Sequence, residues 1–190
     1  LYTAKKKDST GVCFIGERDF DAFLDKYLLS KKGDMINVDT GKKISQHHGL
    51  YHYTLGQRKG IGIGGVGSGE PWFVVGKDLK KNLLYVAQGE QHEALYSTSL
   101  IGEAPAWTLD EEPVFPLHCT AKFRYRQQDI PVTVHKMEDG NLHIVYDNPV
   151  KAVTPGQVAV LYYADICLGS SIIKSIEPLN SKYKYLNPTF

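Results

Sequence analysis

Hydrophobic positions near the start of the chain recur at helical spacing. Between Glu17 and Leu28 the apolar residues fall three or four positions apart, as on one face of an amphipathic helix. These residues are Phe20, Phe23, Leu24, Tyr27 and Leu28. Lys31-Lys32 and then Gly33 follow, a composition that commonly closes a helix. The pattern predicts a helix over about residues 17–28, with its apolar stripe packed into a core.

Beyond Gly33 the pattern changes to short strands separated by turn residues. Asp39-Thr40-Gly41 predicts a hairpin turn between two strands, and a lysine-rich turn after Asp78 separates two more. Six further strands follow at short spacing, with no helix between them. Their ranges are 97–106, 114–123, 131–136, 142–146, 158–163 and 167–176. Strands in this arrangement predict a small closed barrel or a sandwich.

These patterns divide the chain into four parts. Residues 1–28 form an N-terminal segment, 29–94 a small central domain of β or mixed type, and 95–178 an antiparallel β-barrel of about six strands. Residues 179–190 have no clear periodicity and are expected to form a loosely held tail. The predicted fold class is therefore mainly β, with one N-terminal helix. Because the chain begins at Leu1 and not at a methionine, we expect it to be a piece of a longer protein.

The composition restricts the class of protein. The 190 residues are 42% hydrophobic and 23% charged, which is typical of a soluble globular protein. No apolar run approaches the roughly 20 residues that a membrane helix needs, so no membrane contact is expected. The three cysteines lie far apart and form no C-x-x-C pair, which argues against a zinc site or a disulfide framework. A reducing, cytoplasmic setting is the expectation that follows.

The net charge of +1 conceals a segregation of charge along the chain. Residues 118–136 carry four lysines and arginines against one acidic residue, whereas residues 103–112 hold four acidic residues. Residues 54–69 carry Arg58 and Lys59 and no acidic residue. A basic face of this kind suits a polyanion such as a nucleic acid. Solvated loops of mixed charge explain the distribution about as well.

Cys13 is the first candidate for chemistry. It lies in Asp8-Ser9-Thr10-Gly11-Val12-Cys13-Phe14-Ile15-Gly16, between a turn and a short apolar run, with three lysines at positions 5–7. Nearby cations lower the pKa of a thiol and so favour the reactive thiolate. A structural cysteine is the alternative, because the sequence shows no partner residue. Cys119 and Cys167 lie within apolar strand segments and are interpreted as buried packing residues.

A glycine-rich loop and a group of histidines are interpreted as structural. The loop at 60–69 lacks the helix start and the Lys-Ser/Thr ending of a nucleotide-phosphate loop, because a strand pattern follows it. A loop that brings its bare backbone to a larger polyanion fits better. His47, His48 and His52 have no carboxylate or thiol spaced to complete a metal site, so turn and surface positions are expected. Whether His48 or His52 acts as a base for Cys13 stays open.

Arginines and aromatic residues alternate in Phe123-Arg124-Tyr125-Arg126-Gln127-Gln128, at the end of a predicted strand. On a strand, Arg124 and Arg126 would share one face and Phe123 and Tyr125 the other. Arginine binds phosphate in a bidentate manner, and tyrosine stacks on unpaired bases. An edge strand kept soluble by arginines explains the segment equally well. Thr154-Pro155-Gly156-Gln157 predicts a turn with a polar tip.

Five blocks, taken in order, resemble the C-terminal portion of the tRNA-specific 2-thiouridylase family. They are the segment around Cys13, Tyr53-Thr54-Leu55-Gly56-Gln57-Arg58, Glu70-Pro71-Trp72-Phe73-Val74-Val75, Phe123-Arg124-Tyr125-Arg126-Gln127 and Thr154-Pro155-Gly156-Gln157. The resemblance runs to about residue 178. It implies the tail of a catalytic domain, then a central domain, then a β-barrel like those of translation elongation factors. The family's ATP-binding domain, with its Ser-Gly-Gly-x-Asp-Ser loop and its first cysteine, has no counterpart in this sequence.

The resemblance also implies a function, that of a tRNA-uridine 2-sulfurtransferase. The complete enzyme would adenylate the C2 oxygen of the wobble uridine with ATP and Mg²⁺ and replace that oxygen with sulfur. Cys13 would carry the sulfur as a persulfide received from a sulfur-donor protein, and a disulfide between Cys13 and the first cysteine could form along the way. Arg124, Tyr125 and Gln157 would contact tRNA, and Arg58, Lys59 and Arg126 are further RNA-binding candidates. No cofactor or metal site is expected within this chain, which is expected to be a monomer and to be inactive alone.

Two other functions stay open. The chain could be a non-catalytic RNA-binding β-barrel module of the translation-factor type, in which Cys13 is incidental. A cysteine hydrolase that pairs Cys13 with a histidine is the weaker alternative, because no sequence motif supports the convergence of the two. Persulfide or alkylation chemistry concentrated on Cys13, compared with Cys119 and Cys167, favours the sulfurtransferase over the RNA-binding module.

Overall fold

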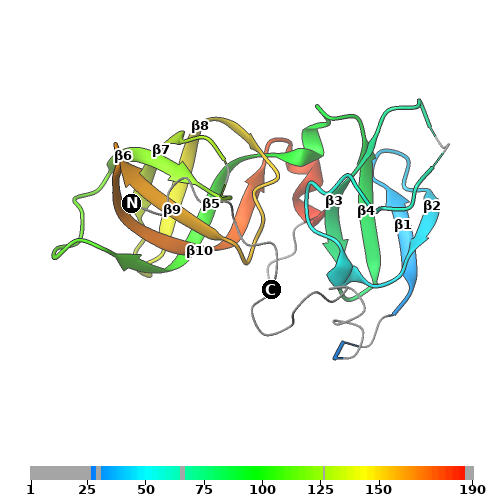
Figure 1. Ribbon diagram of the computed structural model, residues 1–190, viewed down its shortest axis with the longest axis horizontal. Coiled ribbons are helices and arrows are strands. Elements are labelled where there is room, and N and C mark those ends of the chain that lie inside the picture. Colours follow the sequence, from blue (N-terminus) through cyan, green and yellow to red (C-terminus); the bar gives the residue numbers. More distant parts are fainter. Residues whose placement is uncertain (1–26, 29–30, 65–66, 126, 187–190) are drawn as a thin grey trace, which may run out of the picture.

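The computed structural model describes residues 27–28, 31–64, 67–125 and 127–186. Within these residues, ten strands and three short 3-10 helices form two lobes that lie side by side (Figure 1). A four-stranded sheet makes up one lobe and a closed barrel the other. The mainly β fold class predicted from the sequence is confirmed. In the part of the chain that is described, no helix is long and apolar enough to cross a membrane.

The sheet lobe is a mixed sheet with the strand order β2-β1-β4-β3. Its strands are β1 (Gly33–Asn37), β2 (Lys43–His47), β3 (Trp72–Asp78) and β4 (Leu83–Gln88). β1 pairs with β2 and β3 with β4 in the antiparallel sense, while β1 and β4 run parallel. Both predicted strand pairs are therefore confirmed. The long loop between β2 and β3 contains the 3-10 helix η1 (Leu50–His52).

The β1–β2 turn forms where the sequence predicts it, for a local reason. The Asn37 side-chain oxygen accepts hydrogen bonds from the backbone N–H of Asp39 at 2.8 Å and of Thr40 at 3.3 Å. Gly41 then adopts a φ of 65°, a left-handed conformation that glycine takes at no steric cost. An asparagine that bonds to its own turn and a glycine at the left-handed position fix the hairpin.

Both faces of the sheet are buried, each against a different cover. On one face, Met35, Val74 and Leu84 pack against residues of the β2–β3 loop such as Leu50 and Tyr53. On the opposite face, the cluster combines strand residues with residues from beyond the sheet. Its buried members are Phe73, Val75, Tyr85, Ala87, Leu95, Tyr183 and Leu186. Leu95 belongs to the 3-10 helix η2 (Glu93–Leu95), which leads from the sheet into the barrel.

The barrel lobe is a closed ring of six strands in the order β10-β5-β8-β7-β6-β9. The strands are β5 (Tyr96–Trp107), β6 (Leu117–Lys122), β7 (Ile130–Lys136), β8 (Leu142–Lys151), β9 (Val158–Tyr163) and β10 (Ile166–Pro178). Neighbouring strands pair antiparallel all the way around the ring. The sequence left a barrel and a sandwich open, and the structure selects the barrel.

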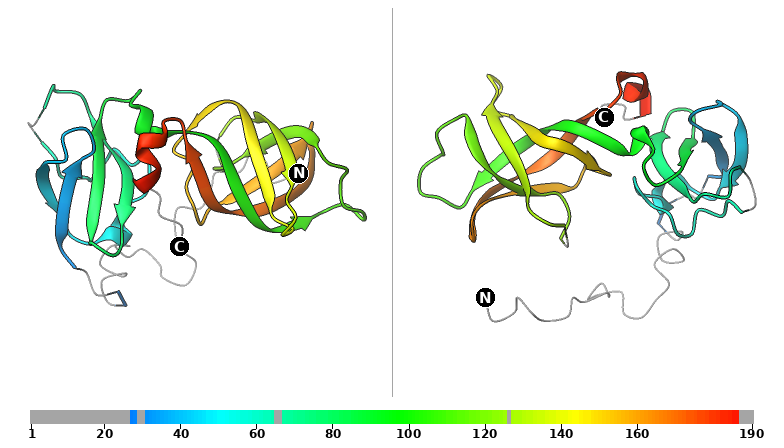
Figure 2. Two further views of the ribbon diagram at one scale, coloured as in Figure 1. Left: turned by 180° about the vertical axis from the view of Figure 1, so that it is seen from behind. Right: turned by 90° about the horizontal axis from the view of Figure 1, so that it is seen from above.

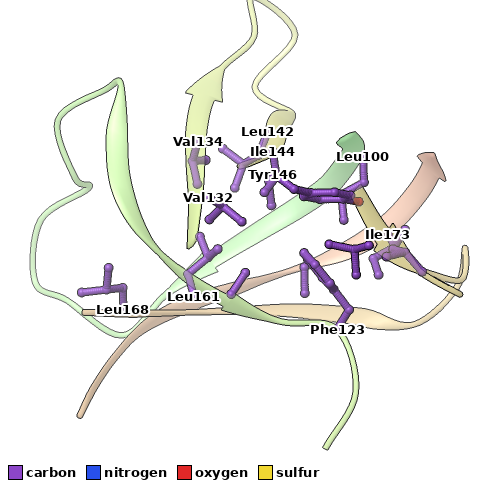
Figure 3. Packing of buried hydrophobic residues seen from close by; sticks show 14 residues of the cluster. Leu100, Phe123, Val132, Val134, Leu142, Ile144, Tyr146, Leu161, Leu168 and Ile173 are labelled. Atoms are coloured by element: carbon purple, nitrogen blue, oxygen red, sulfur yellow. The ribbon is translucent and has the colours of Figure 1, made fainter. Parts of the chain in front are cut away.

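Alternate residues of the barrel strands point inward and form one core (Figure 3). On β8, for example, Leu142, Ile144 and Tyr146 are buried while the residues between them are only partly so. Side chains on a strand alternate between its two faces, so this period of two is what a closed ring requires. Phe123, just beyond β6, also points into the core, with its ring centroid 5.1 Å from that of Tyr146.

The C-terminal segment differs from the loosely held tail that the sequence predicted. Residues Ser181–Leu186 form the 3-10 helix η3, which lies between the two lobes beside β3 (Figures 1 and 2). Tyr183 is 3% exposed and Leu186 is 1% exposed, because both pack against the sheet. For residues 181–186 the prediction was wrong, since a segment too short to show periodicity can still bury two large side chains.

The predicted N-terminal helix lies almost entirely outside the described residues. Only its last two positions, Tyr27 and Leu28, are described, and they lie in a turn and a bend. Their side chains are 73% and 44% exposed. The predicted packing of these two residues into a core is therefore wrong.

Candidate nucleic-acid interface

A groove of about 600 Å³ lies on the barrel, between the end of β6 and strand β9. Three residues that were predicted to contact RNA line it: Arg124, Tyr125 and Gln157. Lys122 and Tyr162 line it as well. The structure thus brings together residues that lie more than thirty positions apart in the sequence, and adds two that the sequence did not single out. The groove gives the predicted RNA contacts a common location.

The segment that carries Arg124 and Tyr125 is a turn that follows the end of a strand, where the sequence placed it. β6 ends at Lys122, and residues 123–125 form a bend and the start of a turn. The Gln127 side-chain oxygen accepts the backbone N–H of Phe123 at 2.8 Å, and the Gln127 N–H donates to the Arg124 carbonyl at 3.1 Å. This turn leaves Tyr125 74% exposed. Phe123 is 2% exposed, so it does not share a face with Tyr125 as it would on a strand. Arg126 lies outside the described residues, so the face that it was expected to share with Arg124 stays a prediction.

Gln157 comes from the loop between β8 and β9. Its backbone N–H donates to the Thr154 carbonyl at 3.2 Å, and Gly156 has a φ of 85°, so the predicted turn is confirmed. The Gln157 carbonyl accepts the N–H of Ile173 at 2.7 Å, which fastens the loop to β10. The side-chain oxygen of Gln157 is buried and has no hydrogen-bond partner among the described residues. Buried acceptors of this kind are rare, and this one stands at the edge of the groove.

Lys122 supplies a positive charge to the groove. Its ammonium lies 5.7 Å from the ring centroid of Tyr162 and 3.1 Å from a carboxylate oxygen of Asp129. The aromatic face and the carboxylate together hold the ammonium near one position. A cation beside exposed aromatic surface is the combination that binds single-stranded nucleic acid, through phosphate contact and base stacking.

One nitrogen of the Arg124 side chain donates hydrogen bonds to other parts of the protein. Its Nη2 donates to the carbonyl of Leu55 and to the carbonyl of Ala152, each at 2.9 Å, and to the Thr154 hydroxyl at 3.3 Å. Burial lowers the pKa of the Arg124 guanidinium, although an arginine stays charged at any pH at which the protein is folded. Three of the sequence blocks behind the family resemblance therefore meet at this one side chain.

Arg58 and Lys59 lie in the loop between η1 and β3, in the sheet lobe. Both side chains are exposed. The Gln57 side chain braces the loop by accepting the N–H of Thr54 and donating to the Lys59 carbonyl, each at 2.9 Å. Neither cation lines the groove on the barrel, so the structure places them on a separate lobe from Tyr125 and Gln157.

His47 differs from the surface histidine that the sequence predicted. It is the last residue of β2 and only 1% exposed. Its Nε2–H donates to the Asn82 carbonyl at 3.1 Å, which leaves Nδ1 unprotonated and, within the described residues, without a partner. Burial lowers the pKa of His47, since the charged form loses its hydration. The described residues contain no group of three or more histidines, cysteines or acidic residues that could hold a metal ion.

The glycine-rich loop is fastened to the sheet through Gln88 of β4. Its side-chain oxygen accepts the Ser68 N–H at 3.1 Å, and its side-chain nitrogen donates to the Glu70 carbonyl at 2.8 Å. β3 begins at Trp72, directly after this loop, so a strand follows it, as the sequence predicted. A helix start, which a nucleotide-phosphate loop would need, does not follow it.

Two of the three cysteines lie within the described residues, and Cys13 does not. Cys119 is half-buried and packs against the barrel core, and burial raises the pKa of its thiol to about 11. It therefore stays protonated and unreactive near neutral pH. Cys167 is half-buried on β10. The predicted packing role fits Cys119, although neither cysteine is fully buried.

Comparison with known proteins agrees with the division into two lobes. A family model described as tRNA methyl transferase PRC-barrel domain matches residues 21–88, and one described as aminomethyltransferase beta-barrel domain matches residues 97–173. A tRNA-specific 2-thiouridylase MnmA of Listeria monocytogenes is 53% identical over 98% of this chain and 49% of its own length. MnmA 2 of Geobacillus kaustophilus gives the same figures, and MnmA of Alkaliphilus oremlandii is 54% identical over 93% of this chain and 48% of its own.

The chain spans about half the length of the curated relatives it matches. The two lobes coincide with the two matched family models, and the identity extends over nearly the whole chain. The chain belongs to the tRNA-specific 2-thiouridylase family.

Proposed function

We propose that this chain is the C-terminal, RNA-binding part of a tRNA-uridine 2-sulfurtransferase. The observation that carries the proposal is the groove, where Arg124 and Tyr125 from one turn and Gln157 from another lie beside a lysine. The relatives are named tRNA-specific 2-thiouridylases, which supports tRNA as the ligand of the groove. The working location of the full-length enzyme is then the cytoplasm, and its partners are tRNA and a sulfur-donor protein.

Each groove residue has a chemical role in this proposal. Tyr125, being 74% exposed, stacks on an unpaired base. Gln157 contributes its side-chain amide to the groove as a polar contact, and Lys122 neutralises a phosphate. Arg58 and Lys59 extend the contact onto the sheet lobe, and Arg126 remains a candidate outside the described residues. Contacts of this kind weaken as salt concentration rises, because binding releases counterions from the RNA.

The chemical step is assigned to Cys13 together with the part of the enzyme that this chain does not span. There the C2 oxygen of the uridine is adenylated by ATP with Mg²⁺, and pyrophosphate leaves. The terminal sulfur of a Cys13 persulfide then attacks C2, and AMP leaves with the original oxygen. A second cysteine attacks the Cys13 sulfur, which forms a disulfide and leaves the sulfur on the base. The described residues hold no group that takes part in these steps.

Two substitutions in the full-length enzyme separate binding from chemistry. Cys13→Ser is expected to abolish 2-thiouridine formation, measured by mass spectrometry of the tRNA, while tRNA affinity stays the same. Tyr125→Ala is expected to weaken tRNA binding about tenfold or more, since stacking contributes roughly 1–3 kcal/mol per base. Tyr125→Phe keeps the ring and should retain most of the affinity. The 190-residue chain alone should not thiolate tRNA.

The alternative of a non-catalytic RNA-binding module makes the opposite prediction for Cys13. If the full-length protein with Cys13→Ser thiolated tRNA at the normal rate, the catalytic assignment would be wrong. Mass mapping of alkylated thiols gives an independent check. Cys13 should react first at neutral pH, and Cys119 should react slowly, because its thiol has a pKa of about 11.

A further inference from the structure

Arg124 stands at the contact between the two lobes and bonds to both of them. The Leu55 carbonyl belongs to the sheet lobe, while the Ala152 carbonyl and the Thr154 hydroxyl belong to the barrel lobe. All three acceptors share one nitrogen, Nη2, at 2.9, 2.9 and 3.3 Å. Because the donor is charged, these bonds are stronger than bonds between neutral groups.

Next to the Arg124 bonds, the two lobes pack closely against each other. Between the lobes, residues such as Leu55, Val75 and Ile176 enclose a space of only about 10 Å³. Gly56 lies so close to Ala152 that a Cβ atom at position 56 would be 2.4 Å from the Ala152 Cβ. Arg124 itself is an exposed residue, so its three bonds lie beside this closely packed contact and not inside it. The bonds and the packing at Gly56 join the same two loops, those that carry Leu55 and Ala152.

The acceptors of Arg124 lie close in sequence to the proposed RNA contacts. Leu55 is three residues before Arg58, and Thr154 is three residues before Gln157. Tyr125 directly follows Arg124. A change in the Arg124 bonds would therefore displace proposed RNA contacts on both lobes at once.

We propose that Arg124 is a positioning residue that fixes the angle between the sheet lobe and the barrel lobe. With the angle fixed, Arg58 and Lys59 of one lobe and Tyr125 and Gln157 of the other meet a single RNA molecule as one preformed surface. The identity of that RNA rests on the proposed function, but the role of Arg124 between the lobes does not.

This role differs measurably from a direct contact between Arg124 and a phosphate. Loss of a phosphate contact lowers the slope of log affinity against log salt by about 0.7–0.9. Loss of a positioning residue leaves the slope of log affinity against log salt unchanged. It lowers the affinity because a smaller fraction of the molecules has the two lobes at the correct angle. If that fraction falls to about a tenth, affinity falls about tenfold.

The test uses the full-length enzyme with two spin labels, introduced through unnatural amino acids at the exposed positions Lys80 and Glu138. Lys80 lies in the β3–β4 turn of the sheet lobe, and Glu138 in the β7–β8 turn of the barrel lobe. Arg124→Ala should broaden the distance distribution between the labels and lower tRNA affinity about tenfold with an unchanged salt slope. The matched control Arg58→Ala also removes one positive charge, and should leave the distance distribution unchanged while lowering the slope.

Two further variants guard against a general loss of folding. Arg124→Lys keeps the charge but lacks the planar fork, so it should keep the salt slope without restoring the narrow distance distribution. Gly56→Ala opens the same contact, so combined with Arg124→Ala it should lower affinity by less than the product of the two separate effects.

Arg124→Ala could instead show the wild-type distance distribution and a salt slope reduced as in Arg58→Ala. That result would overturn the positioning role and make Arg124 a direct phosphate ligand. Multiplicative effects of Arg124→Ala and Gly56→Ala would likewise contradict it. If the wild-type enzyme failed to bind tRNA at all, the proposed function would fall, whereas the distance measurements would still decide the role of Arg124.

Discussion

The barrel buries a single core inside a closed ring of strands, whereas the four-stranded sheet buries two cores, one on each face. Every buried member of the barrel core lies between Leu100 and Ile173, within the barrel's own sequence. The second core of the sheet depends on Leu95, Tyr183 and Leu186, which lie outside its strands. The strands of a closed ring enclose their own core, whereas an open sheet needs other segments to bury the apolar side chains on both of its faces. The two lobes should therefore respond differently to damage at the C-terminal end.

The largest expected effect is the loss of η3. Ending the chain at Asn180 removes Tyr183 and Leu186, and should destabilise the sheet by roughly 5 kcal/mol or more, since each large buried side chain is worth about 2–5 kcal/mol. Hydrogen exchange followed by mass spectrometry should show lost protection in β3 and β4 and intact protection in the barrel strands.

A barrel substitution supplies the matched control. Leu161→Ala removes a fully buried side chain from β9 and should cost about 3 kcal/mol, with protection lost in the barrel strands first. If both changes lowered protection equally in the two lobes, the lobes would form one cooperative unit and the contrast between them would not hold.

An effect of intermediate size is expected on the pH dependence of the stability of the sheet lobe, with none on the barrel. The pKa of His47 is lower in the folded protein than the ordinary value of about 6.5 that applies to the unfolded chain. The unfolded chain therefore binds the proton first as pH falls, so stability is greatest above pH 6.5 and declines below it until the folded-state pKa is reached. The decline is at most about 1.4 kcal/mol per pH unit for one proton.

Denaturant unfolding at several pH values measures this decline. His47→Gln keeps a donor for the Asn82 carbonyl but cannot be protonated, so it should remove that part of the pH dependence from the sheet transition. The barrel transition should be the same in both proteins. An identical pH dependence in wild type and variant would show that another group titrates.

The smallest expected effect is on the groove. Lys122→Ala should lower tRNA affinity a few-fold and reduce the salt slope by about 0.7–0.9, because one cation beside the RNA is lost. Lys136→Ala is the control, because Lys136 is paired with a carboxylate, as Lys122 is, but does not line the groove. Equal slopes for the two variants would indicate that the RNA does not enter the groove near Lys122.

Much of the fold follows from local patterns in the sequence. Most strands lie close to the predicted ranges, because two local patterns mark them. Barrel strands alternate between core and exterior and leave a period of two, whereas β3 and β4, buried on both faces, are continuous apolar runs bounded by turn residues. β8 is an exception, since it continues to Lys151 beyond the predicted end at residue 146. The hairpin at Asn37–Lys42 was predictable from a different local signal, since Asp39, Thr40 and Gly41 are turn residues. The parallel pairing of β1 with β4 was not, because pairing between distant strands leaves no local signal.

The candidate site was only partly predictable. The exposed Tyr125 and the turn at Gln157 have local causes, and both were singled out from the sequence. The bonds of Arg124 to Leu55 and Ala152 were not predictable, because their acceptors are backbone carbonyls from two lobes. Every residue has a backbone carbonyl, so the residue type does not indicate which of them will accept such a bond. The burial of His47 was missed for a similar reason, because its cover comes from tertiary contacts and not from its neighbours in the chain.

The barrel has a consequence for the order in which the protein can fold during synthesis. The start of its first strand, β5, lies beside the end of its last strand, β10. Pro178 pairs with Ser97, and the Leu179 N–H donates to the Tyr96 carbonyl at 2.9 Å. The chain thus leaves the sheet lobe, completes the whole barrel, and returns to the sheet with η3 (Figure 2). A ribosome that has produced all four sheet strands has still not produced Tyr183 and Leu186. One face of the sheet must therefore wait, uncovered, until the last residues of the barrel have emerged.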